Sequence, residues 1–225
     1  MTSDLPAVLV RLEAWLAEHV PAIHATLRPG APDAELDELE GHTGLKLPQA
    51  FRALYRWHDG QDWSVGGVFG LNFLPLERVL GEWAVWQDIG ESHPEMNEDI
   101  PSASHPPEAI RDAYTTPGWL GFLVDGGGNS VGLDLNPGPA GTVGQVITFG
   151  RDEERKFVLA DSLDAFLREY VARLEAGRVS VEASEDFPDL WSIVLHNAQG
   201  EPVHEYMVLA DLYPGFGAAP ARRSR

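Results

Sequence analysis

The region that most constrains the fold lies between positions 119 and 160, where short apolar segments are separated by turns rich in glycine and proline. Four segments have the composition of strands: Trp119–Val124, Val131–Leu135, Val143–Phe149 and Phe157–Ala160. The first connection, Asp125-Gly126-Gly127-Gly128-Asn129, has a turn composition in which positive φ angles cost little. Because turns rather than helices join these segments, we predict an antiparallel meander and not a series of β-α-β units.

Amphipathic helices flank this meander in the sequence. Apolar residues at helical spacing predict helices that begin at Asp4, Asp33, Pro48 and Pro75. A further helix follows the meander, with Ser162 as its N-cap and Gly177 as its stop. A short strand is expected at Val68–Phe73. The predicted fold class is therefore α+β, an antiparallel β-sheet meander flanked by helices.

The length of 225 residues suits one large domain with an appendage. We predict a helix-and-sheet domain over residues 1–176 and a C-terminal strand-containing extension over residues 177–214. The extension holds three candidate strands: Val179–Val181, Trp191–Leu195 and Tyr206–Leu209. Residues 215–225 are rich in Gly, Ala and Pro, a composition expected of a flexible tail.

The chain carries 35 acidic residues against 16 basic ones, for a formal net charge of -19. Such a field repels nucleic acids and anionic lipids and speeds the approach of cationic proteins. We therefore expect a protein partner that is cationic, no nucleic acid and no membrane; the alternative is that the acidity serves only solubility. The start lacks the pattern of a secretory signal, and no run approaches ~18 apolar residues, so a cytoplasmic location is expected.

The motifs that carry catalysis or cofactor binding are missing from the sequence. Cysteine is absent, and the eight histidines show no H-E-x-x-H pattern. Gly128-Asn129-Ser130-Val131-Gly132 matches G-x-S-x-G in letters, but a predicted strand follows it where a nucleophile elbow requires a helix. Gly126–Gly128 is followed by a predicted strand and not by a helix that would cradle phosphate. Asp125, Asn129 and Asp134 offer oxygens to calcium, but their spacing matches no EF-hand loop. We predict no cofactor, no metal and no enzymatic activity.

The most acidic stretch of the chain is a candidate binding surface. Glu91–Pro107 contains several prolines and acidic residues, and we predict that it forms a long irregular surface loop. Tryptophan is a frequent interface anchor because it contributes a large contact area at little entropic cost. The predicted partner-binding residues are Trp63, Trp86, Glu91, Glu95, Glu98, Asp99, Glu108 and Asp112.

Several short motifs follow one another in a characteristic order. They are Leu47-Pro48 with Phe51 and Tyr55, Asp59-Gly60, Trp119-Leu120-Gly121-Phe122, Asp125-Gly126-Gly127-Gly128-Asn129, Leu133-Asp134-Leu135-Asn136-Pro137, Gly144-Gln145-Val146-Ile147 and Ala160-Asp161-Ser162-Leu163. Taken together they resemble the Smi/Knr family of the SUKH superfamily over roughly residues 33–175. Leu120-Gly121 departs from the family, which often has a proline there. Glu91–Pro107 and the region after Gly177 carry no family motif.

This resemblance implies an α+β fold and a role in binding proteins rather than in catalysis. Bacterial members of the family are similar to immunity proteins that neutralise toxins, and fungal members coordinate cell-wall assembly. The leading hypothesis is an immunity-like inhibitor of a basic toxin. The alternatives are a regulator or scaffold of cell-wall or envelope assembly, and a metal-dependent hydrolase with an unrecognised acidic site.

Overall fold

The predicted meander forms the main sheet of the protein. The computed structural model describes residues 4–62, 67–99, 102–183, 191–197 and 199–203. Four strands pair in chain order and antiparallel to one another: β3 (Trp119–Val124), β4 (Asn129–Asp134), β5 (Gln145–Gly150) and β6 (Arg155–Ala160). The α+β fold with an antiparallel meander is therefore confirmed.

Two short strands extend this sheet at its edges. β1 (Asn72–Phe73) pairs antiparallel with β3, and β2 (Ala103–His105) pairs parallel with β6. The sheet order is β1-β3-β4-β5-β6-β2. The expected strand at Val68–Phe73 is thus wrong in length. Gly70 takes a φ of 72° and its N–H bonds to the carbonyl of Gly67, so the chain turns there before the strand begins.

A polar side chain fixes the hairpin between β3 and β4. Asp125 Oδ1 accepts hydrogen bonds from the N–H groups of Gly127 at 2.6 Å and Asn129 at 3.0 Å. Gly126 and Gly128 take φ angles of 80° and 101°, which residues with a β-carbon rarely adopt. The glycine-rich segment is therefore a turn closed by its own aspartate.

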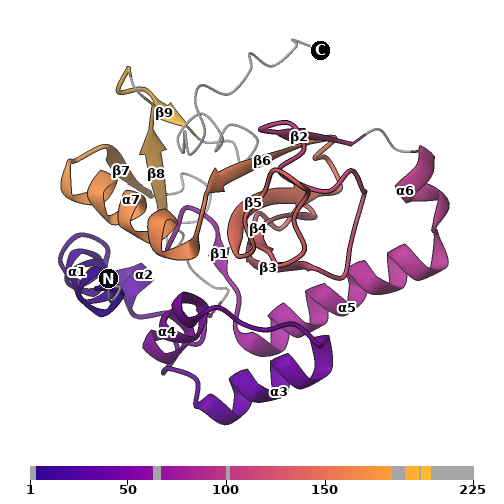
Figure 1. The fold of residues 1–225 in the computed structure, drawn as a ribbon. Coiled ribbons are helices and arrows are strands. Elements are labelled where there is room, and N and C mark those ends of the chain that lie inside the picture. Colours follow the sequence, from indigo (N-terminus) through magenta and orange to yellow (C-terminus); the bar gives the residue numbers. More distant parts are fainter. Residues whose placement is uncertain (1–3, 63–66, 100–101, 184–190, 198, 204–225) are drawn as a thin grey trace.

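Helices pack around the sheet (Figure 1). Their bounds are α1 (Leu5–His19), α2 (Pro21–His24), α3 (Asp33–Thr43), α4 (Gln49–Trp57), α5 (Leu76–Ser92), α6 (Glu95–Asp99) and α7 (Leu163–Glu175). The predicted cap of α7 is confirmed, because Ser162 Oγ accepts a hydrogen bond from the N–H of Ala165 at 3.2 Å. Gly44, with a φ of 70°, ends α3.

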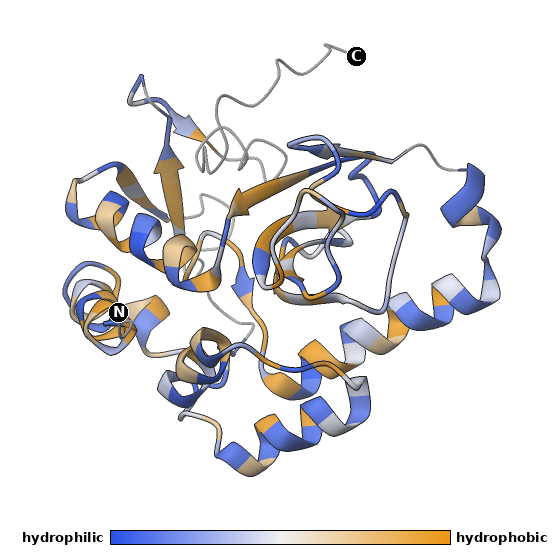
Figure 2. Cartoon of the chain, in the orientation of Figure 1, coloured by the Kyte–Doolittle hydropathy of each residue, from blue (hydrophilic) through white to orange (hydrophobic). Residues whose placement is uncertain are grey.

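Alternation along the strands divides the apolar residues between two clusters. The larger cluster joins α1, α4 and α7 to one side of the sheet, and it includes Leu120, Val146, Phe157 and Leu159. The smaller one includes Trp119, Ile147, Phe149 and Val158. Neighbours in sequence thus fall into different clusters, as expected for a strand buried on both faces. Figure 2 shows that the central strands of the main sheet are mainly apolar and that the helices alternate between apolar and polar residues.

A second sheet follows α7. β7 (Val179–Ala183), β8 (Trp191–His196) and β9 (Pro202–Val203) pair antiparallel in that order. Ile193 and Leu195 of β8 belong to the larger apolar cluster, so this sheet shares the core of the helices. The candidate strand Tyr206–Leu209 and the expected tail at 215–225 lie outside the described residues.

The prediction of an irregular loop over Glu91–Pro107 is wrong. α5 continues to Ser92, α6 follows after Pro94, and β2 pairs with β6 in the same stretch. Pro94 ends one helix and suits the first turn of the next, where its missing N–H has no partner to lose. Pro94 therefore marks a boundary between two helices.

Candidate protein-interaction surface

A hollow of about 390 Å³ lies where α3 and α5 pack together. Both helices run along the same side of the protein (Figure 1). Among the residues that the structure describes, eight line the hollow: Arg28, Glu35, Glu38, Leu39, Asp59, Leu76, Glu77 and Leu80. Three are leucines, four are acidic and one is basic, so the hollow combines an apolar lining with negative charge.

The leucines of the hollow belong to the main core. Leu39 on α3 is 2% exposed and Leu76 on α5 is 5% exposed, while Leu80 is half-buried against the same cluster. Their positions are held by packing, so the apolar lining is rigid. A partner that covers Leu80 would remove further apolar surface from water.

Arg28, the one basic side chain among the described residues of the hollow, is already paired. Arg28 lies 3.5 Å from a carboxylate oxygen of Asp59 and 3.3 Å from one of Glu77. The other oxygen of Asp59 accepts a hydrogen bond from the N–H of Leu76 at 2.7 Å, at the first turn of α5. Asp59, a motif residue in the sequence, thus caps α5 from a distance and orients Arg28.

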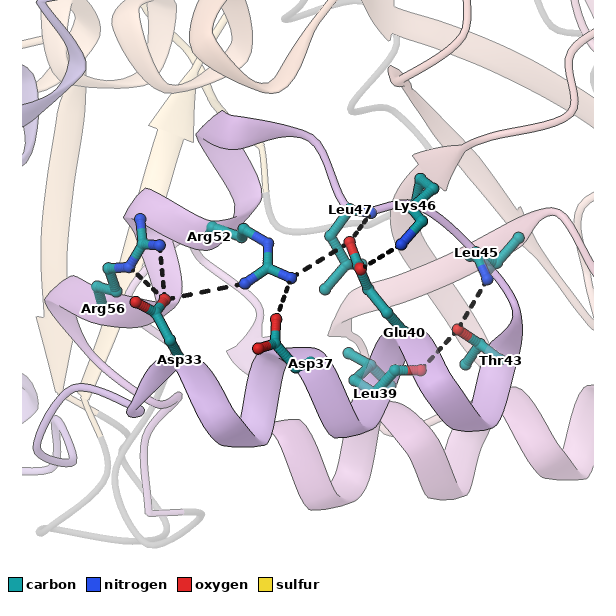
Figure 3. A network of polar contacts seen from close by, with 10 residues as sticks. All are labelled: Asp33, Asp37, Leu39, Glu40, Thr43, Leu45, Lys46, Leu47, Arg52 and Arg56. Atoms are coloured by element: carbon teal, nitrogen blue, oxygen red, sulfur yellow. Dashed lines mark hydrogen bonds and ion pairs between the residues drawn. The ribbon is translucent and has the colours of Figure 1, made fainter.

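The side of α3 that faces α4 has its charges compensated (Figure 3). Arg52 contacts Asp37 at 2.6 Å and Glu40 at 3.3 Å, and Arg56 pairs with Asp33. Glu40 also accepts hydrogen bonds from Lys46 and from the N–H of Leu47, each at 2.9 Å. These donors lower the pKa of Glu40 from its usual value to about 2, with Lys46 as the largest cause.

The opposite side of α3 lacks this compensation. Glu35 and Glu38 are exposed, line the hollow, and form no ion pair with any other residue in the described part of the chain. They are three positions apart, so their side chains are neighbours on one helix face. The carboxylates of α3 that face α4 are therefore paired with basic side chains, whereas those that face the hollow, Glu35 and Glu38, have no ion pair among the described residues.

The residues predicted as an acidic binding face are mostly on the surface. Glu91 lies in the last turn of α5, and Glu95, Glu98 and Asp99 lie on α6. All four are exposed, as are Glu108 and Asp112. Asn97 of α6 accepts hydrogen bonds from the N–H groups of Tyr114 and Thr115, at 2.8 and 3.0 Å. This contact ties α6 to the segment before β3. The acidic residues therefore stand on a structured face.

The two tryptophans predicted as anchors have different outcomes. Trp86 is 9% exposed and its ring packs against Tyr114 and Phe149, with centroids 5.7 and 6.2 Å apart. The helical repeat of α5 turns Trp86 toward the sheet, so little of its ring is left for a partner. Trp63 lies outside the described residues.

The structure brings no metal-binding set together among the residues that it describes. Asp134 lies at the opposite end of β4 from Asn129, so the calcium grouping with Asp125 does not converge. Asp134 is fully buried and accepts hydrogen bonds from Gln145 and from the N–H of Asn136. Burial raises the pKa of Asp134 to about 6. Within the same described ranges, no helix has the length and apolar character needed to cross a bilayer.

The hollow itself could not be predicted from the sequence. The spacing of Glu35 and Glu38 was visible, but their position opposite Leu76 and Leu80 depends on how α3 packs against α5. Arg28 and Asp59 come from two loops that are far from α5 in sequence. The sequence shows only that basic residues are unequally distributed: α4 carries Arg52 and Arg56, whereas α5, which is longer, carries Arg78.

The structure is therefore that of an α+β domain with an acidic, leucine-lined hollow on its surface. Residues 30–169 match the SMI1/KNR4 family (SUKH-1), and the chain belongs to this family. The earlier resemblance is thereby confirmed. The matched segment contains α3, α5 and the whole meander, and all residues of the hollow except Arg28.

Three curated fungal relatives carry names that describe regulation. "Cell wall biosynthesis/cell cycle regulator smi1" of Schizosaccharomyces pombe is 34% identical over 187 residues, covering 78% of this chain and 37% of the relative. "Cell wall assembly regulator SMI1" of Saccharomyces cerevisiae is 27% identical, covering 78% and 42%. "Glucan synthesis regulatory protein" of Neurospora crassa is 30% identical, covering 76% and 38%. The chain thus spans about two fifths of the length of these relatives.

Proposed function

We propose that this chain is a non-catalytic protein-binding domain that regulates cell-wall or envelope assembly. The observation that carries the proposal is the family match over residues 30–169, together with the similarity over 76–78% of the chain to relatives named as regulators of wall assembly and glucan synthesis. This replaces immunity as the leading hypothesis, because the relatives' names favour the regulatory alternative.

The surface chemistry supports binding rather than catalysis. The hollow combines leucines fixed by the core, an arginine held by two carboxylates, and two glutamates open to solvent. Such a surface buries a partner's side chain and compensates its charge. The predictions that the domain acts in the cytoplasm and needs no cofactor are parts of this proposal.

Immunity against a basic toxin is the second candidate, and the formal net charge of -19 favours it. A cationic toxin would be steered to the domain at low salt. The two candidates differ in the number of partners. An inhibitor binds one toxin tightly, whereas a regulator of assembly contacts several proteins of the wall machinery with lower affinity.

Affinity purification of the full chain from its source cells tests the proposal. We expect several proteins of wall-polymer synthesis to be enriched over an unrelated acidic domain of matched net charge. Deleting the gene should also sensitise the cells to compounds that weaken the wall. Recovery of one basic toxin at equal stoichiometry, with unchanged wall sensitivity, would instead support immunity and refute the regulatory role.

A further inference from the structure

The uneven charge pairing of α3 singles out one face of this helix. Asp33, Asp37 and Glu40 each contact a basic side chain of the α3–α4 region, as Figure 3 shows. Glu35 and Glu38 face the hollow without such a contact among the described residues. Two carboxylates of like charge on neighbouring helix positions repel each other. A cation placed between them would relieve this repulsion.

The hollow as a whole carries an excess of negative charge. Glu35, Glu38, Asp59 and Glu77 supply four carboxylates, and Arg28 supplies one guanidinium, which leaves an excess of three negative charges. Arg28 is held between Asp59 and Glu77, so its charge is already compensated. An anionic ligand would meet net repulsion here, whereas a cationic side chain would be attracted.

The leucines add a second requirement for the occupant. Leu39, Leu76 and Leu80 form an apolar lining beside the open glutamates. A small hydrated cation would leave this lining in contact with water. A side chain with an apolar stem and a charged end would cover Leu80, the half-buried leucine of the three, and reach the carboxylates at the same time.

We propose that the hollow between α3 and α5 binds a segment of a partner protein that presents an arginine beside an aliphatic residue. The proposal rests on the protein-binding function proposed above and specifies the surface and the chemistry of the partner. Arginine suits the site better than lysine, because its planar guanidinium donates several hydrogen bonds to carboxylates and sheds water more readily. The aliphatic residue covers Leu80, and the guanidinium lies between Glu35 and Glu38.

Synthetic peptides test this chemistry directly. The probe is an amphipathic peptide of about twelve residues with Arg and Leu at helical spacing. Its matched partner replaces each arginine with citrulline, which keeps the shape and removes the charge. We expect the full chain to bind the arginine peptide at about 0.15 M salt and to bind the citrulline peptide at least about fivefold more weakly. Equal binding of both peptides would overturn the proposal.

A pair of variants separates the hollow from the general acidity of the protein. E35Q/E38Q removes two charges at the hollow, and E98Q/D99N removes two charges on α6. All four side chains are exposed, so neither variant should disturb folding. We expect E35Q/E38Q to lower the affinity for the arginine peptide by about fivefold or more. E98Q/D99N should lower this affinity by less than about twofold. Equal losses of affinity in the two variants would show that binding depends only on the net charge of the protein. The hollow would then be rejected as the binding site.

Methyl NMR provides an independent readout of location. Addition of the arginine peptide should shift the methyl signals of Leu39, Leu76 and Leu80 more than those of Leu163, which lies in the core at the start of α7. If the shifted methyl signals cluster in another part of the protein, the hollow is not the binding site of the peptide.

The same variants distinguish failure of this inference from failure of the proposed function. If the affinity purification recovers wall proteins equally with parent and E35Q/E38Q, the domain is a regulator and the hollow is not its site. If peptide binding is confined to the hollow but no wall protein is recovered, the site is supported and the regulatory function is wrong.

Discussion

At the scale of single residues, the carboxylate of Glu40 has a strongly lowered pKa. Hydrogen bonds from Lys46, Leu47 and Arg52 hold its pKa at about 2 in the folded protein, against an ordinary value near 4.5. Because the folded-state pKa is depressed, these contacts stabilise the fold above about pH 4.5. The stabilisation is lost as the pH falls toward 2.

Replacing Glu40 with glutamine tests this contribution. We expect E40Q to lower the free energy of unfolding by about 1 kcal/mol at neutral pH, because charge-assisted hydrogen bonds are lost. The difference from the parent should shrink as the pH falls through 4 toward 2. Urea unfolding across a pH series measures it. E38Q, without an ion pair among the described residues, is the control and should differ from the parent by less than about 0.5 kcal/mol. A constant difference at all pH values would contradict the assignment to charge.

At the scale of elements, two glycines with opposite surroundings test the packing of the sheet and of α5. A β-carbon on Gly132 in β4 would lie 2.5 Å from the carbonyl oxygen of Leu120 and 2.7 Å from the ring of Phe149. A β-carbon on Gly81 in α5 would meet nothing within 4 Å. Replacing glycine with alanine should therefore have opposite effects on the stability of the protein at the two sites.

We expect G132A to destabilise the protein by about 1–3 kcal/mol, because backbone and a buried ring must both shift. We expect G81A to stabilise it by about 0.5–1 kcal/mol, because alanine has the higher helix propensity and restricts the unfolded chain. Thermal and urea unfolding of both variants provide the comparison. If G81A destabilises the protein, the side of α5 that carries Gly81 must be covered. If G132A leaves the free energy of unfolding unchanged, β4 must be less tightly paired with β3.

The elements that could be predicted are those set by local patterns. The meander follows from alternation and turn residues, and α7 follows from its apolar spacing and the Ser162 cap. The short strands β1 and β2 depend on distant partners, and the parallel pairing of β2 with β6 has no local signal. Trp86 shows the same limit. Trp86 lies seven positions after Val79 and so on the same side of α5, but the position of the sheet decides that this side is buried.

At the scale of the whole molecule, the net charge of -19 and the local chemistry of the hollow should affect different steps of binding. The overall field acts over the distance of the Debye length, about 8–10 Å near physiological salt, and guides a cationic partner before contact. Contacts inside the hollow form only after docking. Association rates should therefore follow total charge, and dissociation rates should follow the hollow.

Replacing Glu95, Glu98 and Asp99 together with serine tests this division once a partner is known. These exposed residues of α6 contribute three charges at the far end of α5, a position away from α3 that Figure 1 shows. If the partner docks at the hollow, we expect the triple variant to slow association at low salt and to leave dissociation unchanged. E35Q/E38Q should instead speed dissociation by about fivefold or more. Surface plasmon resonance over a salt series measures both rates. Faster dissociation of the triple variant would place the contact on the acidic face of Glu91–Asp112, since a residue that acts only by steering has no effect after the complex has formed.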